Sequence, residues 1–236
     1  MIRLEPVTVE HLPLLRSLVA DPAVQRFTRI PVPPPPDFPE QWLDAYLVGR
    51  EDGTRVGFAI VDDETGAQLG MAVAPTIEPE AATAELGYVV ASAARGRGVA
   101  TAALGLLTDW ALEELGAERL ELRISVDNVA SKRVAERCGY VRDGVLRSLY
   151  VKEGLREDTE VWSGSRATRR PAADYLPAFS ETNVATASIW ASLSCPLNDG
   201  IPPCPFVTRS TASSFDGFAS SRFGPTVPLE PAAASV

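Results

Sequence analysis

Histidine and cysteine are scarce in this chain of 236 residues, which contains one histidine and three cysteines. Cys138, Cys195 and Cys204 form no CxxC pair and have no neighbouring histidine, so neither a disulfide framework nor a zinc site is favoured. A Ser-His-Asp triad or a Cys-His dyad would need His11. Because His11 falls in the first turn of the predicted opening helix, we expect it on the surface, and we expect no bound metal.

Positive charge and long apolar runs are also lacking. The formal net charge is −9, so the chain as a whole has no basic surface for nucleic acid or an anionic membrane, and a cationic or neutral substrate is favoured. No apolar run approaches the ~18 residues that span a bilayer, and the start MIRLEPVTVEH lacks the features of a signal peptide. We expect a cytoplasmic protein that binds neither nucleic acid nor membrane.

Hydrophobic periodicity predicts a mixed α/β domain. Strand-like runs cover residues 2–5, 54–61, 68–74, 83–90, 119–126, 140–151 and 155–162, with a turn near 142–144. Helical spacing covers a segment after residue 8, residues 40–50, 98–115 and a segment from residue 127 or 128 to Gly139. The proline-rich stretch 31–39 cannot be helical and is interpreted as a stiff surface spacer.

From residue 164 onward the composition changes. Proline, serine and alanine dominate, periodicity disappears and lysine is absent. A segment this poor in periodic apolar residues is not expected to fold by itself. The sequence therefore predicts a domain over residues 1–163 and a disordered extension over 164–236, and a non-native reading frame in this segment is the alternative left open.

The stretch ARGRGVATAALGLL, residues 94–107, places two glycines and two arginines before a predicted helix. The first N–H groups of a helix have no intrahelical partners, and glycine leaves them accessible to a phosphate. A tight turn without a ligand is the alternative interpretation. Two known phosphate loops do not fit, because GxxxxGK[ST] is absent and GxGxxG would require glycine where Thr101 stands.

Two segments carry a family resemblance. Residues 86–104, LGYVVASAARGRGVATAAL, resemble the acetyl-CoA-binding segment of the GCN5-related N-acetyltransferases (GNATs), whose signature (Q/R)xxGx(G/A) is matched by Arg95, Gly98 and Ala100. Residues 128–147, NVASKRVAERCGYVRDGVLR, resemble the Asn-x-x-Ser…Gly-aromatic…Gly-x-x-Arg pattern of the branch that includes ribosomal-protein-alanine N-acetyltransferases. The resemblance covers residues 1–163 and implies a mostly antiparallel central sheet, flanked by helices and splayed at the acyl-CoA site.

The resemblance also implies which residues bind acetyl-CoA. Pyrophosphate contacts fall on Arg95, Gly96, Arg97, Gly98, Val99, Ala100 and Thr101. The pantetheine arm is expected to pair with the backbone of Val89 and Val90, where a bulge commonly splays the strand. Asn128 and Ser131 are expected to face the pantetheine and the thioester, with helix capping alone as the alternative for Asn128.

Acetyl transfer to an amine requires a proton acceptor, a stabilised oxyanion and a proton for the leaving thiolate. Glu85 is the candidate base, because strand alternation puts it on the same face as Gly87 and Val89. A surface carboxylate is the alternative interpretation. By family analogy the amide near Val89 stabilises the oxyanion. Many GNATs carry a tyrosine that protonates the leaving thiolate at the position of Ala135. Because alanine cannot do this, Ser131 is the candidate acid.

These residues favour an acetyl-CoA-dependent N-acetyltransferase that acts on a protein N-terminus or a small-molecule amine, as a monomer or homodimer. A catalytically silent acyl-CoA-binding module is the second hypothesis, and the retained Glu85 argues against it. A nucleotide phosphotransferase is disfavoured because the P-loop lysine is absent. The aromatic residues Trp42 and Tyr46 are expected to pack in the core, with lining of the acceptor cleft as the alternative.

Overall fold

The computed structural model describes residues 1–170, and residues 171–236 lie outside the described part. Seven strands form one sheet in the order β1-β2-β3-β4-β5-β7-β6. They are β1 (Ile2–Pro6), β2 (Val56–Asp62), β3 (Gln68–Glu78), β4 (Thr83–Val90), β5 (Arg119–Ser125), β6 (Val141–Lys152) and β7 (Leu155–Gly164). Every neighbouring pair is antiparallel except β4 and β5. The predicted mixed α/β fold with a mostly antiparallel sheet is confirmed.

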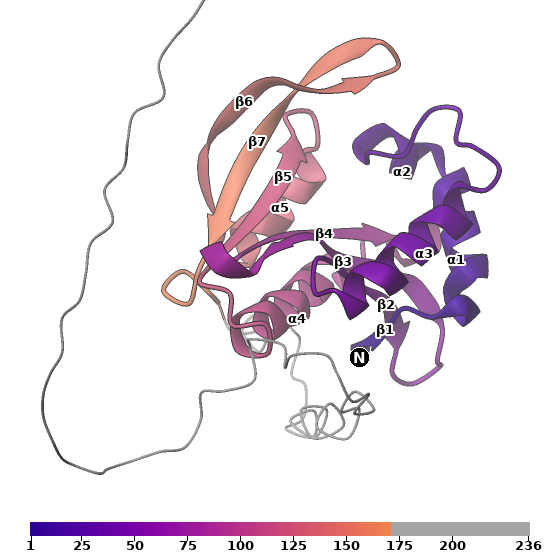
Figure 1. The fold of residues 1–236 in the computed structure, drawn as a ribbon, viewed down its shortest axis with the longest axis horizontal. Helices are drawn as coiled ribbons and strands as arrows, with labels where there is room; N and C mark the ends of the chain where they lie inside the picture. Colours follow the sequence, from indigo (N-terminus) through magenta and orange to yellow (C-terminus); the bar gives the residue numbers. More distant parts are fainter. Residues whose placement is uncertain (171–236) are drawn as a thin grey trace, which may run out of the picture. The chain divides into compact units, whose positions relative to one another are not determined.

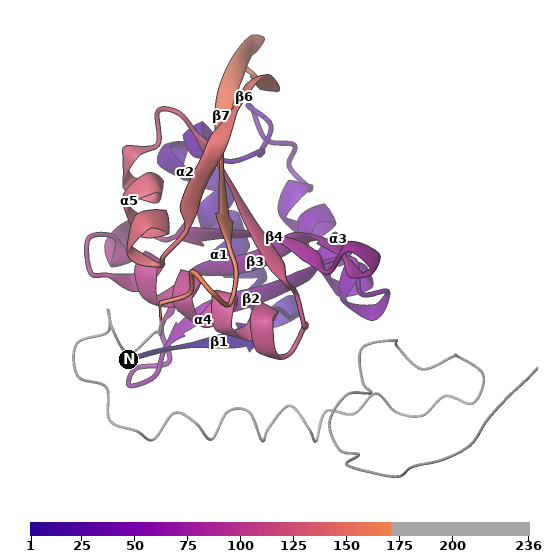
Figure 2. The ribbon, with the colours of Figure 1, turned by 90° about the vertical axis from the view of Figure 1, so that its left-hand side faces the viewer.

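Helices cover both faces of this sheet (Figures 1 and 2). On one face, α1 (Leu12–Ala20), α2 (Pro22–Phe27) and α3 (Phe38–Glu51) pack against Val61 and Met71. On the other face, α4 (Val99–Glu113) and α5 (Val129–Arg137) pack against Phe58 and Ile60. Short 3-10 turns at Val9–His11, Pro79–Ala81 and Ser92–Ala94 join the larger elements.

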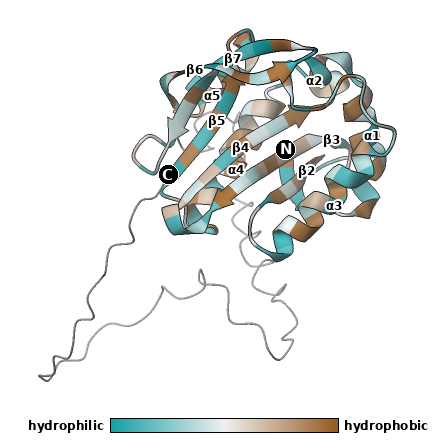
Figure 3. Cartoon of the chain, turned by 45° about the horizontal axis from the view of Figure 1, so that its top comes forward, coloured by the Kyte–Doolittle hydropathy of each residue, from teal (hydrophilic) through white to brown (hydrophobic). Residues whose placement is uncertain are grey.

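The central strands are buried between these two helical layers. Figure 3 shows apolar segments along β2, β3 and β4, and residues 57–61 of β2 are buried without interruption. Burial on both faces explains why β2 reads as a continuous apolar run, since alternation is kept only where one face is solvated. Strand β5 does alternate, with Leu120, Leu122 and Ile124 buried.

Helix α4 is the central helix of the second layer. Its N-cap is Gly98 at φ 79°, and Gly116 at φ 72° follows its last turn. Between them Leu104, Leu107 and Leu112 are fully buried. The apolar periodicity and the flanking glycines therefore located this helix correctly from the sequence.

His11 is the clearest error of the sequence analysis. It is only 5% exposed rather than on the surface. The Thr8 backbone N–H donates to His11 Nδ1 at 3.1 Å, which completes a capping box at the start of the 3-10 turn. The imidazole takes the role that Glu or Gln usually has in this motif, and its burial is tolerated because its Nδ1 has a hydrogen-bond partner.

Several segments also differ from expectation. Helix α3 begins at Phe38, inside the stretch 31–39 that was expected not to be helical, because Pro39 lies in the first turn, where no backbone N–H donor is needed. Strand β3 continues to Glu78, through a stretch expected to be a loop. Residues 142–144 do not form a turn, because β6 continues through a register shift against β7 and the chain reverses at Glu153 and Gly154. Helix α2 was not expected; it begins at Pro22 after Asp21, whose Oδ1 accepts from the Ala23 N–H at 2.8 Å.

The first residues of the predicted extension pack on the domain. Strand β7 includes Gly164, and residues 165–168 form a turn. Arg166 donates to the carbonyl oxygen of Leu112, and Arg169 lies 2.7 Å from Asp109 and 2.6 Å from Glu113. Burial raises the pKa of Asp109, and Arg169 opposes this effect by stabilising the charged carboxylate. The rest of the predicted extension lies outside the described residues.

We expect a chain that ends at Arg170 to melt at the same temperature as the full chain, because it keeps the contacts of residues 165–170 with α4. A chain that ends at Ser165 loses Arg169 and leaves the partly buried Asp109 without its partner. That loss costs about 1–3 kcal/mol, or several degrees in Tm. Thermal melts of the three chains check this, and loss of cooperative melting in the 1–170 chain would show that the fold needs later residues.

Candidate functional site

The sheet opens between β4 and β5. Their parallel pairing is limited to Thr83 with Arg119, Ala84 with Leu120 and Glu85 with Glu121. Beyond Glu85, β4 keeps only its partner β3 up to Val90. One edge of β4 is therefore left unpaired from residue 86 onward, in the middle of the sheet.

The backbone of β4 presents alternate amides to this open edge. The Ala91 N–H donates to the Leu69 carbonyl oxygen on β3 at 2.8 Å, and Val89 is the register partner of Met71. Because hydrogen-bonding direction alternates along an antiparallel strand, Val89 is also directed at β3, whereas Tyr88 and Val90 face the opening. We expected the Val89 amide at the open edge, but the amides that face it are those of the neighbouring residues Tyr88 and Val90.

The expected bulge also lies elsewhere. The register between β3 and β4 shifts between Val73 and Thr76, opposite Leu86, and not at Val89 and Val90. Near the end of β4 the strands approach closely instead: a Cβ at Gly70 would lie 2.1 Å from the Val89 carbonyl oxygen. Gly70 thus permits the close approach of β3 to the strand that forms one wall of the opening.

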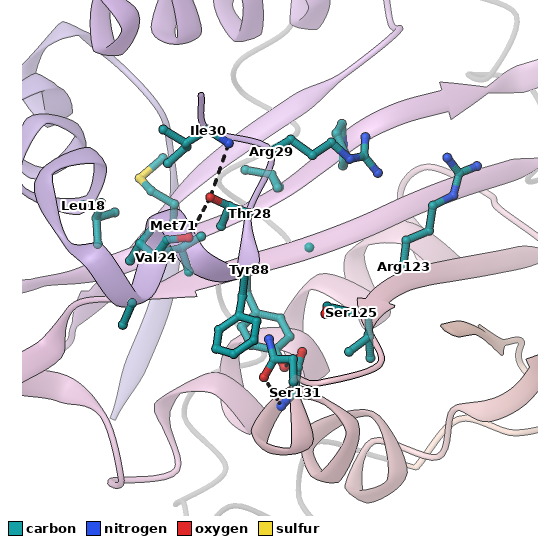
Figure 4. A pocket seen from close by; sticks show the side chains of 18 of the residues that line it. Leu18, Val24, Thr28, Arg29, Ile30, Met71, Tyr88, Arg123, Ser125 and Ser131 are labelled. Atoms are coloured by element: carbon teal, nitrogen blue, oxygen red, sulfur yellow. Dashed lines mark hydrogen bonds between the residues drawn. The ribbon is translucent and has the colours of Figure 1, made fainter. Parts of the chain in front are cut away.

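A cavity of about 850 Å³ occupies the opening and connects the two helical layers (Figure 4). One part is lined by Leu18, Val24, Trp42, Tyr46 and other residues of the α1–α3 layer. The other part is lined by Ala100 of α4 and by Ala130, Ser131 and Val134 of α5. Because β4 and β5 diverge, a ligand can contact groups from both faces of the sheet at once.

The proline-rich segment and the aromatic pair contribute to the cavity wall. Pro31 and Val32, expected to be part of a spacer, both line it. The Trp42 and Tyr46 rings stack with centroids 4.0 Å apart, and Tyr46 is 5% exposed. The two interpretations of this pair hold together, since both aromatics pack in the core and line the cavity.

At one end of β4, the chain turns into α4 through the glycine pair. Gly96 (φ 74°) and Gly98 (φ 79°) have left-handed backbones, and no atom lies within 4 Å of a Cβ at either position. Glycine adopts this open geometry without strain, and no side chain at positions 96 and 98 covers the first amides of α4. Arg95 is held in place: its Nε donates to Val90 O at 3.0 Å, and its guanidinium binds Asp21. Arg97 is exposed and has no side-chain partner within residues 1–170.

Ser131 meets a tyrosine on the opposite wall. The Tyr88 hydroxyl and Ser131 Oγ are 2.8 Å apart, and both appear together at the α5 end of the cavity in Figure 4. Asn128 accepts from the Ser131 N–H at 3.1 Å, so it caps α5 as the alternative interpretation held. Burial raises the pKa of the Tyr88 hydroxyl, which keeps it protonated at neutral pH. Ala135 is fully buried, away from solvent.

Glu85 is buried against the opposite layer. Its side chain is 8% exposed and pairs with Arg29 and, at 3.4 Å, with Arg123. Val89 packs with the α1–α3 layer whereas Leu86 and Tyr88 pack with the α4 layer, which confirms the predicted alternation of β4. Glu85 and Ser131 therefore approach the cavity from opposite faces of the sheet.

Helix α2 and the segment after it are tied to the β6-β7 hairpin. Arg26 binds Glu157, and it lies 3.1 Å from Asp127. Lys152 Nζ donates to the carbonyl oxygens of Thr28 and Ile30 at 3.0 and 2.5 Å. These contacts join the two sides of the cavity mouth and fix the segment that carries Arg29.

The structure brings together most of the residues singled out from the sequence. Those that line the cavity are Glu85, Val89, Val90, Arg95, Ala100, Asn128 and Ser131. Gly96, Arg97, Gly98, Val99 and Thr101 are not part of its lining, although they follow Arg95 directly. Within residues 1–170 no group of three or more His, Cys, Asp or Glu side chains can hold a metal ion. None of the described helices has both the length and the apolar character that a membrane span needs.

Comparison with known proteins identifies the family. Residues 2–141 match the family model described as "Acetyltransferase (GNAT) domain". This match covers more than half of the chain. The chain belongs to the GNAT family of acetyltransferases.

Individual relatives are similar over shorter stretches. Two come from Bacillus subtilis (strain 168). "Probable N-acetyltransferase YjcK" is 35% identical over 79 residues, 34% of this chain and 44% of the relative. "Putative ribosomal N-acetyltransferase YdaF" is 32% identical over 128 residues, 54% of this chain and 64% of the relative. Each alignment thus spans less than two thirds of the relative's length.

A solved structure supports the fold. The chain resembles the ribosomal L7/L12 alpha-N-protein acetyltransferase RimL in complex with coenzyme A, with a TM-score of 0.65 and 20% identity over 70% of this chain and 93% of that one. At this identity the likeness shows the GNAT fold alone.

Three cavity residues escaped the sequence analysis. Tyr88 lies next to the recognised glycine motif, but its partner Ser131 is 43 residues away. Arg29 lies just before the proline-rich segment, and Arg123 is a polar position of a half-buried strand. Strand alternation separates Tyr88 from Glu85 onto opposite faces, and this was the one signal that could have directed attention to the tyrosine.

Proposed function

We propose that this chain is an acetyl-CoA-dependent N-acetyltransferase that transfers the acetyl group directly to a primary amine, on a protein N-terminus or a small molecule. The observation that carries the proposal is the cavity through the split sheet. It joins the Tyr88–Ser131 pair, with Arg95 and Ala100 at the two ends of the glycine turn, on one side to Glu85 on the other. The N-acetyltransferase names of the relatives support the reaction class.

The residues present fit acetyl-CoA as cosubstrate. The open turn at Gly96 and Gly98 before the first amides of α4, and Arg97, which pairs with no side chain within residues 1–170, suit the pyrophosphate. The open edge of β4 offers the backbone N–H and carbonyl of Tyr88 and the N–H of Val90 to an extended pantetheine arm, in the manner of an added strand, while the Val90 carbonyl accepts from Arg95. The coenzyme A bound to the RimL structure, a protein of the same fold, supports this assignment.

Glu85 is the proposed proton acceptor for the amine. It lies in the half of the cavity opposite the glycine turn, and its Oε2 accepts no hydrogen bond within residues 1–170. A carboxylate placed there can take the proton directly or through one water. An α-amino group, with an ordinary pKa of ~7.7–8.0, needs less of this help than a lysine at ~10.4.

Groups on the other wall of the cavity are proposed to act on the thioester. The outward amides of β4 are the proposed oxyanion donors, in place of the Val89 amide. Ser131 is the proposed donor to the leaving thiolate. Tyr88 is a positioning residue that resupplies the Ser131 proton and regains its own proton from water, because burial disfavours a lasting phenolate. A buried tyrosine hydroxyl and a serine 2.8 Å apart form a proton relay without a tyrosine at position 135.

Gly98→Asp is expected to weaken acetyl-CoA binding by more than about tenfold, because it places a negative charge beside the first amides of α4. Arg97→Ala should weaken binding about threefold to tenfold. Gly66→Asp is the matched control, since Gly66 also has a left-handed backbone (φ 70°) and open space around it. Calorimetry with acetyl-CoA checks this; equal affinities in all variants would refute the pyrophosphate assignment.

Glu85→Gln should lower kcat by about 100-fold while leaving acetyl-CoA affinity nearly unchanged. The deficit should shrink as pH rises, because hydroxide and a larger neutral-amine fraction replace the base. A thiol-release assay across pH, with N-terminal peptides and small amines, measures both effects. Tight acetyl-CoA binding without turnover of any acceptor by the parent protein would support the silent acyl-CoA-binding module instead.

Ser131→Ala and Tyr88→Phe test the proton relay. Each should lower kcat, and the double variant should be no slower than Ser131→Ala alone, because a relay fails once its terminal donor is gone. Any decline in the kcat of the parent protein at high pH that comes from loss of the relay proton should disappear in Ser131→Ala. Additive losses in the double variant would contradict a shared path for the proton.

A further inference from the structure

The acceptor half of the cavity holds two arginines around one buried carboxylate. Arg29 donates to Glu85 Oε1, and Arg123 Nη1 lies 3.4 Å from Oε2. The Glu85 side chain is 8% exposed, whereas those of Arg29 and Arg123 are 49% and 35% exposed. Oε2 is buried and, apart from its ion pair with Arg123, accepts no hydrogen bond within residues 1–170, so it keeps an unused acceptor position.

Of the nearby acidic groups, Glu121 and Glu157 lie closest to other arginines. Glu121 lies 3.9 Å from Arg123 but only 3.0 Å from Arg119. Glu157 pairs with Arg26. The remaining carboxylate of the cavity wall, Glu153, is in the turn of the β6-β7 hairpin. The Arg29–Glu85–Arg123 cluster therefore carries one more positive than negative charge at its own position.

Arg29 is held in a defined orientation with donors to spare. Its guanidinium lies over the Tyr150 ring at 4.6 Å, and the Tyr150 hydroxyl accepts from Arg123 at 3.5 Å. Lys152 fixes the backbone on both sides of Arg29. Guanidinium has five N–H donors in a planar fork, and stacking occupies its face rather than its edge. Figure 4 shows Arg29 and Arg123 extending from different elements toward the same end of the cavity.

Charge balance limits which amines suit this cluster. An acceptor that enters as an ammonium ion adds a second excess positive charge to a partly buried site, which is unfavourable. An acceptor that brings a carboxylate with its amine leaves the excess charge unchanged and can bind the free edge of Arg29 in bidentate fashion. The negative charge of the whole chain favours cationic ligands only at longer range, where salt screens it.

From this arrangement we infer that the preferred acceptor carries a carboxylate within a few bonds of its amine, and that Arg29 selects it. A peptide whose first residue is acidic and a free α-amino acid both have this chemistry. Because Arg29 binds Oε1 of Glu85, the carboxylate that is the proposed proton acceptor for the amine, the acceptor's acid and amine must be close together. The inference rests on the proposed acetyl-transfer function, since it names the substrate class of that reaction.

The test compares matched acceptors. An Asp-Ala dipeptide amide and an Asn-Ala dipeptide amide differ only in side-chain charge, free alanine supplies an α-carboxylate, and spermidine supplies amines alone. Thiol release gives kcat/KM for each, and calorimetry on the coenzyme A-saturated protein gives acceptor affinity without turnover. The variants are Arg29→Gln, which removes the charge, and Arg29→Lys, which keeps the charge but loses the fork. Acetyl-CoA affinity serves as the control for folding.

For the parent protein we expect the Asp peptide or alanine to exceed both the Asn peptide and spermidine by at least tenfold. Whichever of these two acceptors has the higher kcat/KM identifies the source of the carboxylate. Arg29→Gln should bring the Asp-to-Asn ratio close to one with acetyl-CoA affinity unchanged, and Arg29→Lys should fall between. Preference for spermidine or the Asn peptide, or an unchanged ratio in Arg29→Gln, overturns the inference while acetyl transfer stands. Failure to bind acetyl-CoA overturns the proposed function itself, and the inference with it.

Discussion

The short parallel pairing of β4 with β5 is the constraint on which the site depends. Three residue pairs hold the two strands together, and beyond Glu85 they diverge. In a continuous sheet, side chains on opposite faces of one strand cannot reach a common ligand, because successive residues point in opposite directions. The divergence removes this barrier, so Glu85 and Tyr88, three positions apart on β4, approach one cavity from different layers.

Two sets of ion pairs and hydrogen bonds fix the walls of this cavity. Asp21 caps α2 and also binds Arg95, which in turn donates to the end of β4. On the far side, Arg26 and Lys152 tie α2 and the following segment to the β6-β7 hairpin. Exposed pairs of this kind add little stability one at a time, but together they set the distance between the elements of the cavity wall.

Local signals were sufficient for much of the fold and for the glycine turn. The stripe of α4, its flanking glycines and the alternation of β5 each arise within one segment, so the sequence predicts them without knowledge of neighbours. Where a contact with a residue far away in the sequence decides the local structure, the prediction was wrong or missing. Strand β6 passes through residues 142–144 because β7 pairs with it on both sides of the register shift. His11 is a different kind of error, since its hydrogen-bond partner Thr8 is only three residues away.

The sequence by itself determined the identity of the chemical groups near the cavity: the glycine motif, Glu85, Asn128 and Ser131 all lie in short recognisable stretches. The tertiary structure decided which of them meet and what accompanies them. Arg29 and Arg123, 94 positions apart, converge on Glu85 only because a loop and a strand are brought to the same opening. Charge clusters of this kind depend on side-chain distances of a few ångströms, which no local pattern of residues specifies.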